Sequence, residues 1–295
     1  MLTRRIVLVL VALLLPVSAA PAQEKLRAVA TFSILADFAK NVGGDRVDVQ
    51  ALVGPNADAH VYQPSPGDAK ALADAKVIFT NGLGFEGWIA RLIKASGTRA
   101  PMVVATKGMK PRKMDEDGHV ETDPHAWQSV PNAKIYVANI RDALIAADPA
   151  GKSSYEANAT TYLAKLAALD ADVKAMIDKI PAERRRIITT HDAFGYFAAA
   201  YGVSFIAPQG VSTESEVSAR DVAKIITQIR KQKIPAVFLE NITNDRLLKR
   251  IGAEGGARVG GTLYSDALTD EKGPAPTYID MMRHNVKQLA DALMS

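Results

Sequence analysis

Apolar residues along the chain alternate between short continuous runs and sets with helical spacing, and this alternation is the main structural signal of the sequence. In the first half, the short runs that predict strands lie at residues 26–32, 47–53, 77–79 and 102–105. The helically spaced sets between them lie at residues 34–42, 68–75 and 88–95. A strand followed by a helix at this rhythm is typical of parallel βαβ units, so we predict an α/β lobe.

The second half repeats this rhythm after a long helix. Its predicted strands lie at residues 186–190, 203–207, 236–240 and 259–263, and its predicted helices at residues 193–200, 219–232, 245–252 and 277–293. Between the halves, residues 131–147 predict one helix and residues 154–180 a longer one. The longer helix carries an apolar stripe formed by Tyr162, Leu166, Leu169, Val173, Met176 and Ile177. At 1.5 Å per residue it would extend about 40 Å, enough to bridge two lobes.

These patterns divide the chain into two parallel-sheet α/β lobes. We expect the first lobe over residues 23–150, a linking helix over residues 151–181 and the second lobe over residues 182–295. A length of 295 residues with 48% hydrophobic content agrees with two domains, each large enough to bury its own core.

The rhythm breaks at residues 110–119, where polar and charged residues predict a surface loop. His119 lies in this segment, and the stretch from Asp115 to Glu121 is strongly acidic. Two roles stay open for His119: a weak, mobile metal contact, or one residue of an ordinary charged loop.

The first residues have the pattern of a secretory signal. Arg4 and Arg5 precede an apolar run at residues 6–15, and small residues follow up to Ala22. The run is too short to span a bilayer, so we expect a signal peptide at residues 1–22 and a periplasmic protein that is not inserted in the membrane. Removing the two arginines would lower the net charge from +4 to +2, which gives no reason to expect nucleic acid as a partner.

The chain contains no cysteine. Disulfides and thiolate metal ligands are therefore excluded, as is the cysteine to which the lipid of a bacterial lipoprotein is attached. We expect a protein that is not lipidated, and any metal it binds must be held by imidazole and oxygen.

Three of the five histidines lie in similar positions. His60 lies in the loop after a predicted strand, His125 lies in the segment 123–127, and His191 directly follows the predicted strand 186–190. A single histidine is more often an ordinary surface or core residue, but three in such loops indicate a metal site, because open α/β sheets bind ligands beyond the carboxyl ends of their strands. Asp266, after the last predicted strand, is a candidate fourth ligand, although alone it would be interpreted as a helix cap. His284, inside the final predicted helix, is interpreted as structural.

The chemistry of this set favours binding over catalysis. Neutral imidazole suits zinc, and a carboxylate completes four-coordination by nitrogen and oxygen. Four protein ligands leave no position for a reactive water, so we predict no catalytic residue and no enzymatic activity.

The segment Gly82 to Gly87 matches the glycine pattern of dinucleotide-binding loops. The first acidic residue after the following helix is Asp115, far beyond the offset of about 20 residues that a ribose-binding carboxylate needs. We therefore predict a tight turn, with Glu86 near the positive end of the following helix.

With these residues in view, nearly the whole chain after residue 22 resembles the metal-binding substrate-binding proteins of bacterial ABC transporters for zinc and manganese. The motifs that carry the resemblance are Pro55-Asn56-Ala57-Asp58-Ala59-His60-Val61-Tyr62-Gln63-Pro64-Ser65-Pro66, Asn81-Gly82-Leu83-Gly84-Phe85-Glu86-Gly87-Trp88, Asp123-Pro124-His125-Ala126-Trp127, Thr190-His191-Asp192-Ala193-Phe194 with Tyr196, Gly210-Val211-Ser212-Thr213-Glu214 and Tyr264-Ser265-Asp266-Ala267-Leu268.

The resemblance implies two α/β lobes joined by a single long rigid helix, with a metal in the cleft between them. It assigns His60 and His125 to the first lobe and His191 and Asp266 to the second. It also implies a monomeric receptor that delivers metal to a membrane permease driven by a cytoplasmic ATPase.

Two questions stay open at this stage. The first is the metal: His191 favours Zn²⁺, because manganese-selective members often carry glutamate there, whereas the short loop before His125 lacks the histidine-rich stretch of many zinc members. The second is the class of protein. An exported zinc hydrolase would use Asp192 or Glu240 as general base, and a receptor for an organic solute would not need the histidines.

Overall fold

The computed structural model describes residues 24–116, 119–214 and 217–294. The predicted signal peptide, residues 1–22, lies outside the described residues. Within the described ranges, no helix is both long enough and apolar enough to cross a membrane.

The first lobe is built on a parallel four-stranded sheet of strand order β2-β1-β3-β4. Its strands are β1 (Leu26–Phe32), β2 (Val47–Val53), β3 (Val77–Thr80) and β4 (Met102–Val104). Its helices are α1 (Ser33–Gly43), α2 (Pro66–Asp74) and α3 (Ile89–Ser96), with a short 3-10 helix, η1 (Gly44–Arg46). All four residues of β3 are buried, which explains why this strand reads as a continuous apolar run.

The second lobe repeats the same topology. Its sheet has the order β10-β9-β7-β8, again parallel, so in both lobes the first strand lies between the second and the third. The strands are β7 (Arg186–Ile188), β8 (Ser204–Ile206), β9 (Ala236–Glu240) and β10 (Arg258–Leu263). The helices are α6 (Gly195–Tyr201), α7 (Ala219–Gln232) and α8 (Arg246–Gly255). This order creates a crevice at the carboxyl ends of β7 and β9, the place where such sheets bind ligands.

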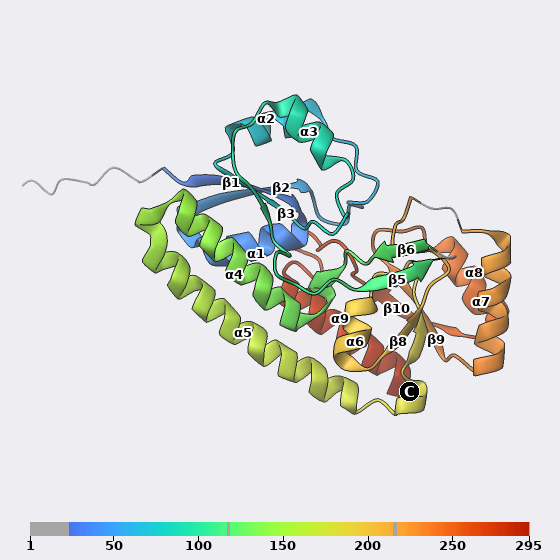
Figure 1. Cartoon of the computed structure of the whole chain (residues 1–295). Helices are drawn as coiled ribbons and strands as arrows, with labels where there is room; N and C mark the ends of the chain where they lie inside the picture. The colour runs from blue at the N-terminus through green and yellow to red at the C-terminus, as the bar shows by residue number, and fades with distance from the viewer. Residues whose placement is uncertain (1–23, 117–118, 215–216, 295) are drawn as a thin grey trace, which may run out of the picture.

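Three long helices pack beside the two lobes, and one of them, α5, runs from the first lobe to the second, as Figure 1 shows. They are α4 (Val130–Ala147), α5 (Lys152–Asp178) and α9 (Tyr278–Met294), accompanied by the 3-10 helices η2 (Ala126–Gln128), η3 (Pro149–Gly151) and η4 (Ala182–Arg184). The predicted long helix is α5, which runs along one side of the molecule from the first sheet towards the second. It buries five of the six residues of the predicted stripe against α1, α4 and α9.

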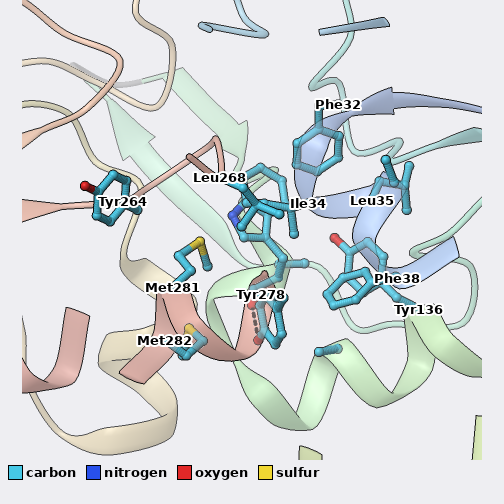
Figure 2. Close-up of a cluster of buried hydrophobic side chains, with 14 of the residues drawn as sticks. Phe32, Ile34, Leu35, Phe38, Tyr136, Tyr264, Leu268, Tyr278, Met281 and Met282 are labelled. Atoms are coloured by element: carbon cyan, nitrogen blue, oxygen red, sulfur yellow. Dashed lines mark hydrogen bonds between the residues drawn. The ribbon is translucent and has the colours of Figure 1, made fainter. Parts of the chain in front are cut away.

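The C-terminal helix α9 packs against both lobes in one shared apolar core (Figure 2). The ring of Tyr278, on α9, packs 4.7 Å from that of Phe38, on α1, and its hydroxyl donates to the backbone oxygen of Trp127 over 2.7 Å. The backbone N–H of Tyr278 donates to the buried carboxylate of Asp37. Because apolar residues of both halves of the chain form one cluster, the arrangement of the lobes is set by core packing as well as by α5.

One predicted segment folds differently. The sequence predicts a loop at residues 110–119, but an antiparallel hairpin forms from β5 (Lys113–Glu116) and β6 (His119–Thr122). The prediction was wrong because both strands are charged and lack the alternation of apolar and polar residues that marks a half-buried strand. The side chains of residues 115–119 lie outside the described part of the structure, so both roles considered for His119 stay open.

Candidate metal centre

The structure brings the four predicted residues to one point. His60, His125, His191 and Asp266 each place one ligand atom so that all four atoms lie within 4.8 Å of one another. His60 comes from the loop between β2 and α2, His125 precedes η2, His191 follows β7 and Asp266 follows β10. His60 is 8% exposed and the other three are fully buried.

The spacing of these atoms suits a small divalent cation. The Nε2 atom of His60 lies 3.2 Å from Nε2 of His125 and 3.2 Å from Oδ2 of Asp266, and Nε2 of His191 lies 3.1 Å from that same oxygen. Atoms that surround an ion tetrahedrally at zinc–nitrogen distances are about 3.3 Å apart. The other carboxylate oxygen of Asp266, Oδ1, is buried and has no hydrogen-bond partner among the described residues, which also fits a cation at this position.

Buried carboxylates orient two of the imidazole rings. The Nδ1 atom of His125 lies 2.9 Å from Oδ1 of Asp123, and Nδ1 of His191 lies 2.5 Å from Oε2 of Glu240. Glu240 is fixed in turn, because its other oxygen accepts from the backbone N–H groups of Thr190 and His191 at 2.6 and 3.0 Å. Holding Nδ1 in this way directs Nε2 of each ring into the centre and makes it a better ligand.

Buried carboxylates beside the histidines favour positive charge at this site. Burial lowers the pKa of His60. Burial alone would also lower the pKa of His191, but the carboxylates of Glu240 and Asp266 outweigh it and raise that pKa well above its ordinary value. Burial opposes the charge of Asp266, yet the charges of His191 and His125 hold the pKa of this carboxyl well below its usual range. The buried carboxylates thus favour positive charge beside His191, and a divalent cation would supply it in place of a proton.

Contacts across the cleft fix the loop that carries Asp266. The side chains of Trp127 and Gln128, from the first lobe, both donate to the backbone oxygen of Ser265, at 2.8 and 2.6 Å. The neighbouring backbone oxygen of Leu268 accepts from the N–H of Asn56 at 2.9 Å. The two lobes are therefore closed on each other around the four residues.

The exposed edge of His60 faces a groove of about 480 Å³. Its wall is formed by the turn at Leu83 to Phe85, by Glu121 of the hairpin and by Val211 and Glu214 of the second lobe. This groove reaches the centre at His60, and we call it the access groove.

The predicted turn at residues 82–87 is present, with positive φ angles at Gly82, Leu83 and Gly84. Glu86 lies three residues before the start of α3, and its backbone oxygen accepts from the N–H of Ile89. Its buried carboxylate faces back to the end of β3, where it accepts from the N–H groups of Asn81 and Gly82 and from the hydroxyl of Thr31. Glu86 thus holds the turn closed beside the groove.

Sequence reasoning missed the residues that support the ligands. Asp123 was not singled out, and neither was Asp58, although each stands two residues before a predicted ligand and accepts a hydrogen bond from that histidine's backbone N–H. The shared spacing Asp-x-His was the signal that could have found them. Glu240, nominated as a general base, is instead engaged by His191 and two backbone N–H groups.

Two parallel α/β lobes that meet at a buried set of three histidines and one aspartate have the arrangement expected of a metal-binding receptor. Residues 28–292 match the family described as zinc-uptake complex component A, periplasmic (ZnuA). The chain belongs to this family, which confirms the resemblance and the two-lobed fold class drawn from the sequence. The expectation that the protein is not an enzyme is also confirmed, since the family consists of transport receptors.

Relatives and solved structures agree over nearly the full length. The chain is 38% identical over 268 residues to the iron-binding protein YfeA of Yersinia pestis, covering 90% of this chain and 86% of that protein. It is 31% identical over 283 residues to the manganese ABC transporter substrate-binding lipoprotein PsaA of Streptococcus pneumoniae, covering 94% and 91%. The structure of the periplasmic zinc-binding protein TroA of Treponema pallidum superposes with a TM-score of 0.87 at 31% identity, covering 92% of this chain and 99% of that one. The manganese-bound periplasmic metal-binding protein of Candidatus Liberibacter asiaticus gives a TM-score of 0.81 at 33% identity, covering 91% and 100%.

Proposed function

We propose that this protein is a periplasmic zinc receptor in which His60, His125, His191 and Asp266 bind one Zn²⁺ ion for delivery to an ABC importer. The observation that carries the proposal is the buried cluster of three imidazole nitrogens and one carboxylate oxygen, with neighbouring atoms 3.1–3.2 Å apart. The ion is the cargo of transport. A site closed by four protein ligands retains it without activating water.

The donor set is the reason for choosing zinc. The names of the relatives and solved structures include zinc, manganese and iron, so family membership alone leaves the metal open. Three imidazoles and one carboxylate favour Zn²⁺, whereas Mn²⁺ prefers more oxygen ligands and binds more weakly to nitrogen in the Irving–Williams order. His191 is the residue that decides this balance, because an acidic residue there would convert the set to two nitrogens and two oxygens.

The way the lobes are joined supports delivery by small movements. We propose lobe boundaries at residues 150/151 and 181/182, with α5 as the rigid link. A single helix and a shared apolar core resist wide opening, so loading and release would use local movements of the ligand loops. The partner is a membrane permease with its cytoplasmic ATPase, which a monomeric receptor would meet in the periplasm.

We also propose that the mature protein carries no lipid anchor. Several relatives are named lipoproteins, among them PsaA of Streptococcus pneumoniae. This chain has no cysteine to accept such a lipid. The intact mass of the exported protein tests the point: it should equal that of an unmodified chain, and an added mass of several hundred daltons or more would contradict it.

Metal analysis of the purified protein tests the function. We expect one zinc per chain, and loss of stoichiometric binding in the His60→Ala and His191→Ala variants. His284→Gln is the matched control, because His284 lies outside the cluster and contacts the backbone oxygen of Thr262. An organic ligand retained by both alanine variants, or hydrolytic turnover that depends on zinc, would contradict the proposal.

A further inference from the structure

The loop that carries His60 is hydrogen-bonded to both lobes. On the side that follows His60, the hydroxyl of Tyr62 donates to Asp68 at 2.9 Å, and Ser65 and Asp68 cap the start of α2, all within the first lobe. On the side that precedes it, the backbone oxygen of Ala59 also accepts from Trp88 of the first lobe at 2.8 Å, but residues 56 and 58 are bonded to the second lobe. A relative movement of the lobes therefore acts on the short segment that leads into His60.

Two residues make the bonds to the second lobe. The first is Asn56, whose N–H donates to the backbone oxygen of Leu268 and whose side-chain oxygen accepts from Asn241 at 3.1 Å. The second is Asp58, whose Oδ2 atom accepts from the hydroxyl of Thr213 at 2.6 Å.

Asp58 is the more direct of the two connections. Its other oxygen, Oδ1, accepts from the backbone N–H of His60 at 2.9 Å. One carboxylate thus bonds at the same time to the backbone of a candidate ligand in the first lobe and to a hydroxyl of the second lobe. Hydrogen bonds to a charged acceptor are stronger than those between neutral groups. The Asp58 carboxylate therefore connects the backbone of His60 strongly to Thr213.

The segment that carries Thr213 is in turn bonded to the segment of His191. Gln209 pairs with His191 as an isolated β-bridge, and the N–H of Asp192 donates to the backbone oxygen of Gly210 at 3.1 Å. The side-chain amide of Gln209 also donates to the backbone oxygen of Thr213 at 2.9 Å. Hydrogen bonds therefore connect the backbone of His60, through Asp58, Thr213 and Gln209, to the residues on either side of His191.

His60 is also the candidate ligand best placed to leave first. It is the one of the four with an exposed edge, and that edge faces the access groove. The rings of His125 and His191, by contrast, are fully buried and held by Asp123 and Glu240.

We propose that Asp58 is a positioning residue for His60, and that its hydrogen bond with Thr213 controls the rate at which bound metal leaves the site. The inference rests on the proposed function, because it takes His60 as a ligand. While the bond is intact, the backbone of His60 is held against the second lobe and the ring stays over the centre. When the lobes shift and the bond breaks, His60 can turn into the groove and the ion can follow it.

Zinc release measured by stopped flow into an excess of fluorescent chelator tests the proposal. Thr213→Val removes the donor with little change of shape, and we expect release about tenfold faster, the effect of losing one hydrogen bond to a charged group. Thr213→Ser keeps the hydroxyl and should release zinc at the wild-type rate. Thr227→Val is the matched control, because the exposed hydroxyl of Thr227 donates to the backbone oxygen of Ala223 within α7. Thermal unfolding of the metal-free variants should show that all three are folded.

A second comparison places the effect at Asp58. Asp58→Ala should also speed release, and adding Thr213→Val to it should change the rate no further, because both changes break the same connection. Additive effects, or release from Thr213→Val at the wild-type rate, would overturn the inference while leaving zinc binding intact. If the wild-type protein binds no stoichiometric zinc, it is the proposed function that fails.

Discussion

One carboxylate oxygen of Asp123 serves both the ring and the backbone of His125: it lies 2.9 Å from Nδ1 and accepts from the backbone N–H at 3.0 Å. The ring orientation of His125 is therefore determined two residues earlier in the chain. Arg112 lies 3.4 Å from the other oxygen of Asp123 and stacks over the ring of Tyr196 in the second lobe. A single aspartate thus connects a candidate ligand to the contact between the lobes.

Replacing Asp123 by alanine should weaken zinc binding about 10- to 100-fold, the usual cost of removing the residue that orients a metal-bound histidine. Isothermal titration with a competing chelator would measure the change. Asp142→Ala is a suitable control, since Asp142 is exposed and pairs with Arg141. Equal affinities for the Asp123 variant and the wild type would show that His125 needs no such support.

Gly195→Ala should weaken zinc binding through the same aspartate. A Cβ atom at Gly195 would lie 2.6 Å from Oδ2 of Asp123 and 2.9 Å from Nε of Arg112, closer than such contacts allow. The crowding must displace Asp123 or separate the lobes, at a cost of about 1–3 kcal/mol. The control is Gly54→Ala, where an added Cβ meets nothing within 4 Å. Unchanged zinc affinity in Gly195→Ala would contradict the close approach of the lobes.

The pH dependence of zinc affinity should respond to Glu240. The charges of Glu240 and Asp266 raise the pKa of His191, so zinc must displace a proton and the apparent affinity rises with pH through the neutral range. Glu240→Gln removes one of these charges and should lower that pKa. The rise in affinity should then level off at a lower pH than in the wild type. Chelator competition from about pH 5.5 to about pH 8.5 would measure both curves, and parallel curves would contradict the assignment.

The stability of the metal-free protein should depend on Asp37. Burial raises the pKa of this carboxyl from 3.8 to about 6, so the neutral form is favoured in the folded state. Its contribution to stability is fully present below pH 3.8 and is lost as the pH rises through about 6, which amounts to roughly 3 kcal/mol.

Asp37→Asn stays neutral and keeps an oxygen that can accept from the N–H of Tyr278. Relative to the wild type, this variant should therefore gain about 3 kcal/mol between about pH 4 and about pH 7. Urea unfolding in the presence of a chelator would measure the difference at both pH values. A difference that is the same at the two pH values would mean that Asp37 does not titrate in this range.

Much of the fold could be predicted because its strands and helices follow simple apolar patterns. The bounds of β1, β2, β9 and α7 agree with the predicted ranges to the residue. The long helix α5 was predicted to within two residues at each end, because its stripe of buried residues is unambiguous. It begins and ends two residues earlier than predicted. The charged hairpin β5–β6 could not be predicted in this way, since its stability depends on contacts that leave no periodic signal.

The candidate ligands could be predicted because parallel sheets bring the ends of distant strands together. The supporting residues could not, because their roles depend on which loops meet across the cleft. The bond between Asp58 and Thr213 joins residues 155 positions apart, and nothing in either local sequence indicates the other. The spacing of residues could have indicated only the short-range contacts, in which an aspartate bonds to the histidine two residues later, at His60 and at His125.

The central claim is that three imidazoles and one carboxylate select zinc. A competition titration of the metal-free protein with Zn²⁺ and Mn²⁺ at neutral pH tests it most directly, with bound metal measured after removal of excess ions. We predict that zinc displaces manganese from the site at equal concentrations. In the His191→Glu variant, the ratio of zinc affinity to manganese affinity should be smaller than in the wild type. Tighter binding of manganese than of zinc by the wild-type protein would contradict the claim.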